Sequence, residues 1–361
     1  MISRRQFLVS GLWAASIGGL TYGLWPRLNK YDEELAFQRQ LIQSDPSLLE
    51  FVRMATLAAN SHNTQPWKFL LGSNSVRILP DYARRTEVVD PDDHHLCISL
   101  GCAAENLAQA AKAHGRAALM TTNTDGETSV DIALDQSSSI EDTLYPAIPM
   151  RQSTRSVFDG QSLATSDIEL LQSAARQDGV SVLFFTNAPD RDAILDLVVA
   201  GNSAQMDDPA FVDELREWIR FSPSRAIATG DGLFGACSGN PVVPEWLGGP
   251  MFRTFFTKES ENTKYRDQIR SSAGIAVFIG DRADPEHWIN VGRSFERFAL
   301  QATTMGIRNA HINQPVEVPA VRAEFASWLG MADIRPDLVV RFGRAPVLPM
   351  SLRRPVESVL T

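Results

Sequence analysis

A seven-residue segment, Ser61 to Trp67, constrains the fold of this chain more than any other. It reads Ser-His-Asn-Thr-Gln-Pro-Trp and lies between an apolar helical run, Leu48 to Ala59, and a strand-like run, Trp67 to Leu71. Pro66 lacks an N–H group and pushes Gln65 towards an extended conformation, so the chain turns here from helix into strand. Small polar side chains at such a corner can point inward and bind a ligand, although Ser, Asn and Pro are also ordinary turn residues.

A second polar segment, Arg151 to Gly160, reads Arg-Gln-Ser-Thr-Arg-Ser-Val-Phe-Asp-Gly. Exposed arginine is common, so a solvated basic turn would by itself explain this sequence. Together, however, the two segments resemble the flavin-binding motifs of the nitroreductase superfamily, which have the forms Ser-x-Asn-x-Gln-Pro-Trp and Arg-x-Ser-x-Lys/Arg-x-x-Phe. In that superfamily both segments close on one FMN.

The resemblance covers residues 45 to 361 and is closest to the Acg-like branch, in which two nitroreductase-like halves are fused in one chain. It implies an α+β fold with a first half at 28–140 and a second half at 141–361. The corner motif occurs only in the first half and the arginine motif only in the second. The resemblance therefore implies one complete FMN site between the halves, held by a monomer that acts as a pseudo-dimer.

The resemblance assigns a role to each motif position. Arg151 and Ser153 are expected at the FMN phosphate, because arginine offers a planar donor fork and serine a compact hydroxyl. Arg155 is expected at the pyrimidine edge of the flavin, where a cation favours the reduced anion. Three further residues, namely Ser61, Asn63 and Gln65, are expected at the flavin or its ribityl chain, with Trp67 in the adjoining core.

Two later segments complete the expected site. Arg353 and Arg354 lie in a basic tail that resembles the one completing the phosphate site in the family, although basic residues near a chain end are often only solvated. Asn313 and Gln314 lie in the segment His-Ile-Asn-Gln-Pro, which fits the part of the family fold that passes over the flavin ring. His62 occupies a variable motif position and remains a minor candidate.

Hydrophobic periodicity and turn residues predict the secondary structure. Helices are expected over 46–59, 90–114, 165–179 and 287–305, and strands over 67–71, 75–79, 117–121, 129–134, 180–185, 275–279 and 338–342. The segment 190–221 is expected to be helical, with breaks near Gly201 and Pro209. Residues 222–250 contain many Gly and Pro and little periodicity, so we expect a long, lid-like loop there.

Three patterns are expected to carry no site. His94 and His95 lie beside three aspartates, but adjacent side chains diverge on a helix and no metal-ligand spacing recurs, so no metal is predicted. Residues 230–235 spell Gly-x-Gly-x-x-Gly without the preceding apolar strand that a dinucleotide site requires. The three cysteines, Cys97, Cys102 and Cys237, form no disulfide framework and are expected as buried thiols.

The N-terminus carries a targeting signal. Ser3-Arg4-Arg5-Gln6-Phe7-Leu8 matches the twin-arginine export pattern, and no charge follows from Phe7 to Pro26. An ordinary membrane anchor with two flanking arginines is the alternative. Since no good Ala-x-Ala cleavage site closes the run, residues 1–27 are expected either to be removed or to remain as an anchor, with the protein outside the cytoplasm.

Composition narrows the function classes. The chain is 44% hydrophobic, which fits a globular protein with a sizeable core, and its net charge of -9 argues against a general nucleic-acid binder. The resemblance implies an FMN oxidoreductase that passes hydride from a donor such as NAD(P)H to a nitro-aromatic, quinone or similar acceptor, with no side-chain nucleophile. A protein that stores FMN without turnover is the alternative, and an envelope structural protein is a third.

Overall fold

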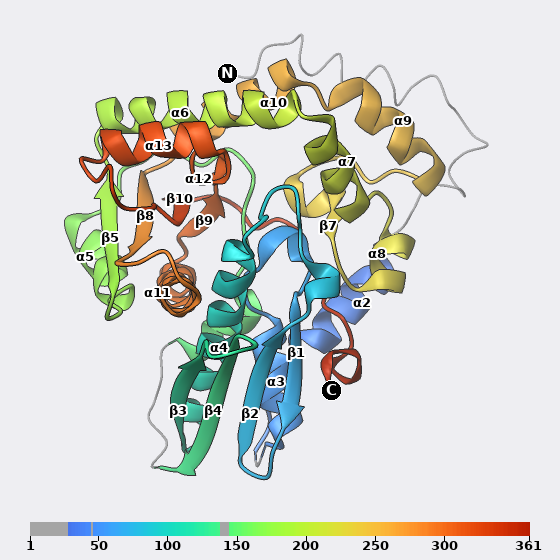
Figure 1. Ribbon diagram of the computed structural model, residues 1–361. Helices are drawn as coiled ribbons and strands as arrows, with labels where there is room; N and C mark the ends of the chain where they lie inside the picture. Colours follow the sequence, from blue (N-terminus) through green and yellow to red (C-terminus); the bar gives the residue numbers. More distant parts are fainter. Residues whose placement is uncertain (1–27, 45, 138–143) are drawn as a thin grey trace.

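The computed structural model describes residues 28–44, 46–137 and 144–361 (Figure 1). The fold mixes helices with antiparallel sheets, which confirms the predicted α+β class. The export signal predicted at 1–27 and the half boundary predicted at 140/141 lie outside the described residues. Within those described ranges, no helix is long and apolar enough to cross a membrane.

The first half contains one four-stranded sheet. Its elements are α2 (Asn29–Gln38), α3 (Leu48–Thr56), β1 (Trp67–Leu71), β2 (Ser75–Pro80), α4 (His94–Ala113), β3 (Arg116–Asn123) and β4 (Ser129–Gln136). The strands run antiparallel in the order β1-β2-β4-β3. Buried and exposed residues alternate along β2, as expected for a sheet with one face on the core. The strands predicted here are all present.

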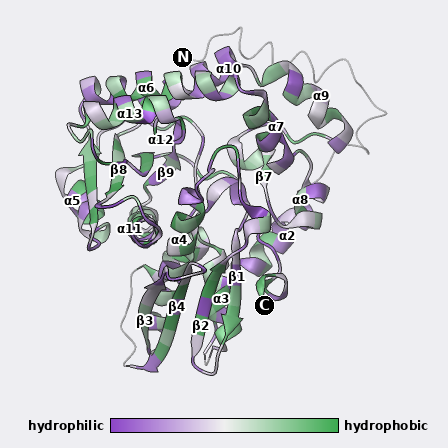
Figure 2. Ribbon diagram, viewed as in Figure 1, coloured by the Kyte–Doolittle hydropathy of each residue, from purple (hydrophilic) through white to green (hydrophobic). Residues whose placement is uncertain are grey.

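The second half repeats this topology. Its strands are β5 (Val180–Phe185), β8 (Gly274–Gly280), β9 (Arg308–His311) and β10 (Leu338–Gly343), in the antiparallel order β5-β8-β10-β9. The 20-residue helix α11 (Pro285–Thr304) lies between β8 and β9, just as the 20-residue α4 lies between β2 and β3. Strand order and helix placement therefore agree with the expectation of two related halves. Every residue of β8 and β10 is buried, and Figure 2 shows β8 mostly in hydrophobic colours.

The halves meet where α4 crosses α11. A Cβ on Gly101 of α4 would lie 2.0 Å from the carbonyl oxygen of Ile289, and a Cβ on Gly292 of α11 would lie 2.0 Å from the carbonyl oxygen of Ile98. Each helix thus presents a glycine to the other's backbone, in a reciprocal arrangement. Only glycine permits so close a contact, because any side chain would meet a backbone carbonyl.

The halves differ in the connection between their first two strands. In the first sheet three residues, 72–74, join β1 to β2, whereas 88 residues, 186–273, join β5 to β8. This insertion contains α6 (Ala188–Met206), α7 (Pro209–Trp218), α8 (Pro223–Thr229), α9 (Glu245–Phe255) and α10 (Lys258–Arg270). It forms the upper layer in Figure 1, together with α12 (Gln314–Glu317) and α13 (Pro319–Trp328). The helix α5 (Thr165–Ala174) precedes β5.

Two predictions for this insertion were wrong. Helix α6 continues through Gly201 without a break, because the glycine is required by close packing: a Cβ there would lie 2.7 Å from the carbonyl oxygen of Gln314. The segment 222–250 is not a long loop, since it includes α8 and the start of α9. Ser222 caps α8 through its side chain, and Pro223 occupies the first turn, so the start signal was present in the sequence.

The start of α4 also differs from its prediction. The helix begins at His94, after Asp93 adopts a left-handed conformation with φ 57°. Asp90 nevertheless caps it, because its carboxylate accepts the backbone N–H groups of His95 and Leu96 at 3.0 and 2.9 Å. The rings of His94 and His95 do not diverge as expected: their centroids are 4.6 Å apart, because both side chains pack against the second half of the protein.

Candidate functional site

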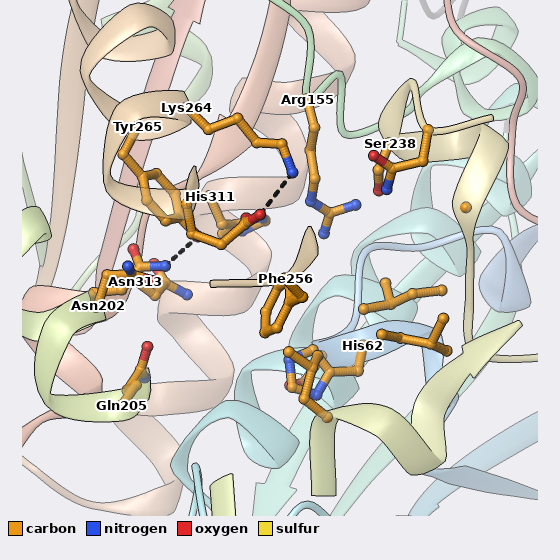
Figure 3. A pocket seen from close by; sticks show the side chains of 18 of the residues that line it. His62, Arg155, Asn202, Gln205, Ser238, Phe256, Lys264, Tyr265, His311 and Asn313 are labelled. Atoms are coloured by element: carbon orange, nitrogen blue, oxygen red, sulfur yellow. Dashed lines mark hydrogen bonds and ion pairs between the residues drawn. The ribbon is translucent and has the colours of Figure 1, made fainter. Parts of the chain in front are cut away.

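A cavity of about 660 Å³ lies between α4 and the insertion of the second half. Its floor comes from the first half, with Ser61 and His62 of the corner and His95 and Ser99 of α4. Its walls and roof come from the second half. The polar lining there includes Arg155, Asn202, Gln205, Ser238, Lys264, Tyr265, His311, Asn313 and Gln314, most of which Figure 3 labels. The cavity is therefore built from both halves.

The corner that follows α3 has an unusual backbone. His62, Asn63 and Gln65 all have positive φ, at 47°, 54° and 54°. Left-handed residues other than glycine cost free energy and are held in place by their surroundings. Here the side-chain oxygen of Asn60 accepts the N–H of Gln65 at 2.8 Å. The turn brings Ser61 and His62 to the cavity, and burial lowers the pKa of His62 to about 4.

Asn63 and Gln65 do not line the cavity; they hold the corner to the second half. The Asn63 amide donates to the carbonyl oxygens of Gly232 and Leu352 at 3.0 and 3.1 Å. The Gln65 amide donates to the carbonyl oxygen of Gly230 at 2.8 Å, and its oxygen accepts the N–H of Arg354 at 2.8 Å. Both side chains are buried. Direct contact of either residue with a flavin remains a prediction.

Arg155 points into the cavity from the segment that precedes α5, as Figure 3 shows. Its backbone carbonyl accepts the amide of Gln268 at 2.6 Å, which fixes this part of the chain. Within the described part of the chain no hydrogen-bond acceptor or carboxylate reaches its guanidinium group. Burial lowers the pKa of Arg155. The side chain is half-buried, and its unpaired guanidinium group offers charge-assisted hydrogen bonds to an electron-rich ligand in the cavity.

Arg151 and Arg353 come together next to the C-terminal end of α3, although neither lines the cavity. Arg151 forms an ion pair with Glu296 of α11, with 2.9 Å between Nε and Oε1. Arg353 donates to the carbonyl oxygens of Thr56, Leu57 and Ala58 at 2.6, 3.1 and 3.2 Å. Its pKa is lowered well below the usual value, first by burial and then by neighbouring cations.

Arg39 adds a third cation to this cluster. Its guanidinium donates to the carbonyl oxygens of Pro149 and Ser351 at 2.8 and 3.2 Å, and burial followed by the charge of Arg151 lowers its pKa to about 10. Among the described residues, the carboxylate of Glu296 pairs with Arg151 and acts on the charge of Arg353, and its own pKa is raised by burial. The surplus of positive charge suits an anion.

Ser153 and Arg354 lie outside the cavity lining. Ser153 is half-buried and its backbone forms an isolated bridge with Asn309, which places it beside the start of β9. Arg354 donates to the carbonyl oxygens of Gln65 and Ser358 and lies 3.7 Å from a carboxylate oxygen of Asp81. The roles predicted for these two residues remain predictions.

Asn313 and Gln314 line the cavity as the start of α12. The Asn313 side-chain oxygen accepts the N–H of Val339 at 3.0 Å, and the Gln314 amide donates to the Tyr265 hydroxyl at 2.5 Å. The Gln314 oxygen, Nδ1 of His62 and Nε2 of His95 are buried without a hydrogen-bond partner. Buried polar atoms are almost always paired, so these three lining groups are available to a ligand.

The sequence analysis missed the aromatic roof of the cavity. Five phenylalanines of the insertion line it, namely Phe211, Phe221, Phe252, Phe255 and Phe256. The rings of Phe252 and Phe256 stack with centroids 4.5 Å apart and planes 18° apart. The run Met-Phe-Arg-Thr-Phe-Phe at 251–256 was the available signal, because apolar residues spaced three and four apart form one helix face. A roof of flat apolar groups favours a planar ligand.

Comparison with known proteins shows what the whole chain is similar to. No family model matches the chain. A Mycobacterium tuberculosis protein named "Putative NAD(P)H nitroreductase", recorded in strains CDC 1551 and H37Rv, is 25% identical over 332 residues, covering 85% of this chain and 89% of the relative. The chain is similar to a nitroreductase over most of its length.

Solved structures of nitroreductases are also similar in part. The FMN-dependent nitroreductase of Mycobacterium smegmatis in complex with NADPH is 12% identical, with a TM-score of 0.37, and covers 56% of this chain and 87% of its own. A nitroreductase with bound FMN from Desulfitobacterium hafniense is 14% identical, with a TM-score of 0.37, and covers 62% and 98%. At these scores we draw no functional conclusion from the structures.

Proposed function

We propose that this protein is an FMN-dependent oxidoreductase of the nitroreductase type, with NAD(P)H as a possible donor. The observation that carries the proposal is Arg155, a half-buried cation that faces a cavity built from both halves and has no hydrogen-bond or ion-pair partner for its guanidinium group among the described residues. The similarity to the M. tuberculosis protein over 85% of the chain supports it. When bound, FMN accepts hydride from a donor and passes it to an acceptor such as a nitro-aromatic or a quinone.

The lining residues fit the flavin ring. Arg155 would hold the electron-rich pyrimidine edge, and the unpaired Gln314 oxygen would accept a hydrogen bond from a ring N–H. The aromatic roof presents flat apolar groups to a planar ring system. The imidazoles of His62 and His311, whose pKa values burial lowers to about 4 and about 3, stay uncharged at neutral pH. Lys264 also lines the cavity but pairs with Glu261, so Arg155 would be the cation available to the ring.

The phosphate assignment rests on the surplus charge of the arginine cluster. Arg151, Arg353 and Arg39 share one buried carboxylate, so a phosphate near this cluster would balance two positive charges. In the described structure these arginines are held by Glu296 and by backbone carbonyls. To bind a phosphate, Arg151 would have to give up part of its ion pair with Glu296. Ser153 and Arg354 would contribute only if their side chains came within hydrogen-bond distance of the same phosphate.

The experiment is to purify the full chain, denature it and identify the released flavin by chromatography. FMN is expected, at one per chain and in a monomer, because each half supplies one of the two motifs. Light scattering combined with flavin absorbance gives that ratio. A colourless protein that cannot be reconstituted with FMN would overturn the proposal.

The Arg155→Gln variant tests the role of Arg155. Loss of a charge-assisted hydrogen bond costs about 1.5–3 kcal/mol, which weakens FMN binding roughly 10- to 150-fold. Arg266→Gln is the matched control, because Arg266 is exposed on α10 and does not line the cavity. Equal FMN affinity in both variants would remove Arg155 from the site.

FMN storage without turnover is the second candidate, favoured by the insertion that roofs the cavity. Steady-state reduction by NADPH, with and without a nitro-aromatic acceptor, separates the two functions. Acceptor-dependent NADPH oxidation is expected of the oxidoreductase, whereas a flavin that NADPH does not reduce would support storage.

We also propose export by the twin-arginine route, on the basis of Arg4 and Arg5 in the N-terminal pattern. The protein would then act outside the cytoplasm, with 1–27 removed or kept as a membrane anchor. Replacing both arginines by lysine keeps the charge and removes the recognised pattern, so cell fractionation should find the precursor in the cytoplasm. Unchanged export would instead indicate an ordinary secretory signal or anchor.

A further inference from the structure

A second, smaller site lies at the N-terminal end of α4. Asp90, His94 and His95 are all buried, and one ligand atom of each lies within 4.8 Å of the others. They line a cavity of about 50 Å³, together with Glu317 at the end of α12. A space of this size accommodates a single ion or water molecule. Its lining thus combines imidazole and carboxylate groups from both halves.

His94 is held in the manner of a metal ligand. Its Nε2 lies 2.7 Å from Oδ1 of Asp337, and both side chains are 1% exposed. The other oxygen of Asp337 accepts the N–H of Gly280 at 2.6 Å, which fixes the carboxylate. Metal-binding histidines usually use one ring nitrogen for a carboxylate or carbonyl and the other for the metal. This contact leaves Nδ1 of His94 free to bind.

His95 supplies the independent observation. The residue is 6% exposed, and its Nε2 has no hydrogen-bond partner. Its Nδ1 lies 3.8 Å from Oε1 of Glu317, which is too long for a hydrogen bond. A buried imidazole without a partner at either nitrogen is costly in the interior. Each carboxylate oxygen of Asp90 accepts one backbone N–H group and keeps a second lone pair, which can bind a metal ion.

The surrounding charges favour a cation. Arg335 and Arg322 also line the small cavity. Arg335 is already engaged, because it pairs with Asp92 and its guanidinium lies 5.4 Å from the Trp288 ring centroid. Arg322 donates to the carbonyl oxygen of Val316 at 3.2 Å. Both arginines also act on the charge of Asp337, so Asp90 and Glu317 are the lining carboxylates left to balance an added positive charge.

We propose that Asp90, His94, His95 and Glu317 bind a divalent transition-metal ion of the zinc class. Two imidazoles and two carboxylates match the donors that zinc accepts, and ligand atoms about 2.0–2.2 Å from the metal in a tetrahedron lie roughly 3.4 Å apart. The ligand atoms of Asp90, His94 and His95 already lie within 4.8 Å of one another, and Glu317 approaches this group through His95, with 3.8 Å between Oε1 and Nδ1, so binding draws the Glu317 carboxylate inward. The ion links α4 of the first half to α12 of the second.

This link has a structural consequence. His95 lines both the small cavity and the large one, so the metal fixes the imidazole that forms part of the floor of the larger site. The ion thereby acts as a clamp between the halves, independent of any redox step. The inference does not rest on the proposed oxidoreductase activity.

The test is metal binding by the full-length protein after chelator treatment and dialysis. We expect one Zn²⁺ per chain by isothermal titration and elemental analysis, a rise in Tm on adding Zn²⁺, and a Co²⁺ complex with visible absorption typical of tetrahedral coordination. His95→Gln and Glu317→Gln should each weaken Zn²⁺ binding at least tenfold and abolish the Tm rise. His287→Gln is the control, because His287 pairs with Asp284 and does not line this cavity.

Asp337→Asn gives a separate measure, because it alters the group that orients His94 without removing a ligand. Zn²⁺ affinity should fall about 10- to 100-fold. Metal-free Tm and tryptophan fluorescence identify any variant that fails to fold, in which case Glu317→Gln decides. Absence of stoichiometric Zn²⁺ or Co²⁺ binding by the natural chain would overturn the proposal, as would unchanged affinity in His95→Gln and Glu317→Gln.

Discussion

The crossing of α4 and α11 makes Gly292→Ala a sharp test of how the halves are joined. The added methyl group would lie 2.0 Å from the carbonyl oxygen of Ile98 and 3.0 Å from the backbone nitrogen of Cys102. Since a carbon–oxygen contact needs about 3.3 Å, the helices must separate by about 1.3 Å. These atoms belong to the backbone of α4 and cannot rotate away.

The magnitude follows from two opposing effects. Separating the two helices opens a gap between them, and a gap of 0.5–1 Å already loses about a quarter to a half of the dispersion energy of the atoms that line it. Overpacking a core by one methyl group usually costs about 1–3 kcal/mol, and we expect a cost near the upper end, about 3 kcal/mol. Alanine is a better helix former than glycine by about 1 kcal/mol. Gly292→Ala should therefore lower the free energy of unfolding by about 2 kcal/mol.

Urea unfolding followed by tryptophan fluorescence measures this change, and Trp288 at the start of α11 is a convenient reporter. Gly249→Ala is the comparison: it is also a helical glycine, and beyond its chain neighbours its added methyl group would meet nothing closer than 3.8 Å. Its effect should stay well below about 2 kcal/mol, because the helix preference of alanine opposes the crowding with Pro250. If Gly292→Ala is as stable as the natural chain, the halves do not depend on this contact.

Three further results are expected. Glu296→Gln removes the carboxylate shared by the buried arginines and should destabilise the protein by about 3–5 kcal/mol in urea unfolding; a loss below 1 kcal/mol would show that the cluster is balanced otherwise. Arg353→Lys should lower the unfolding free energy by about 1.5–3 kcal/mol, because lysine cannot reach three carbonyls at once, and unchanged stability would contradict that role. The pKa of His62 is lowered to about 4 in the folded protein, whereas in the unfolded chain it is about 6.5, so between these pH values the unfolded chain binds a proton that the folded protein does not. The free energy of unfolding should therefore fall as pH is lowered from about 6.5 to about 4, and it should fall less steeply in His62→Asn. If the free energy of unfolding depends on pH in the same way in both proteins, His62 does not contribute to that dependence.

Local sequence determined most of the elements. The strands predicted at 67–71 and 180–185 have those bounds in the structure, because β-branched and aromatic residues there are bounded by clear turn signals. The capping role of Asp90 was also readable, since it depends on residues only five and six positions away. The α+β class was implied by the resemblance that the two motifs carry, and the observed helices and antiparallel sheets agree with it.

The sequence could not indicate which motif residues reach the cavity. Ser61 and Arg155 line it. Asn63 and Gln65 instead donate hydrogen bonds to backbone carbonyl groups more than 160 positions away along the chain, those of Gly232, Leu352 and Gly230. That choice depends on where distant carbonyl groups lie once the halves have packed. No local pattern contains this information.

Only the tertiary structure decided the partners of the buried charges. His94 and His95 were set aside because neighbours on a helix diverge, yet the second half brings Asp337 and Glu317 to them from 243 and 222 positions away. In the same way, the ion pair of Arg151 with Glu296 on α11 forms only when the two halves pack together. Helix and strand depend on the spacing of side chains along a few turns, so a sequence determines them locally. A buried charge pairs with a group that the folded chain places within a few ångströms of it. Here the packing of α4 against α11 decides which groups are that close.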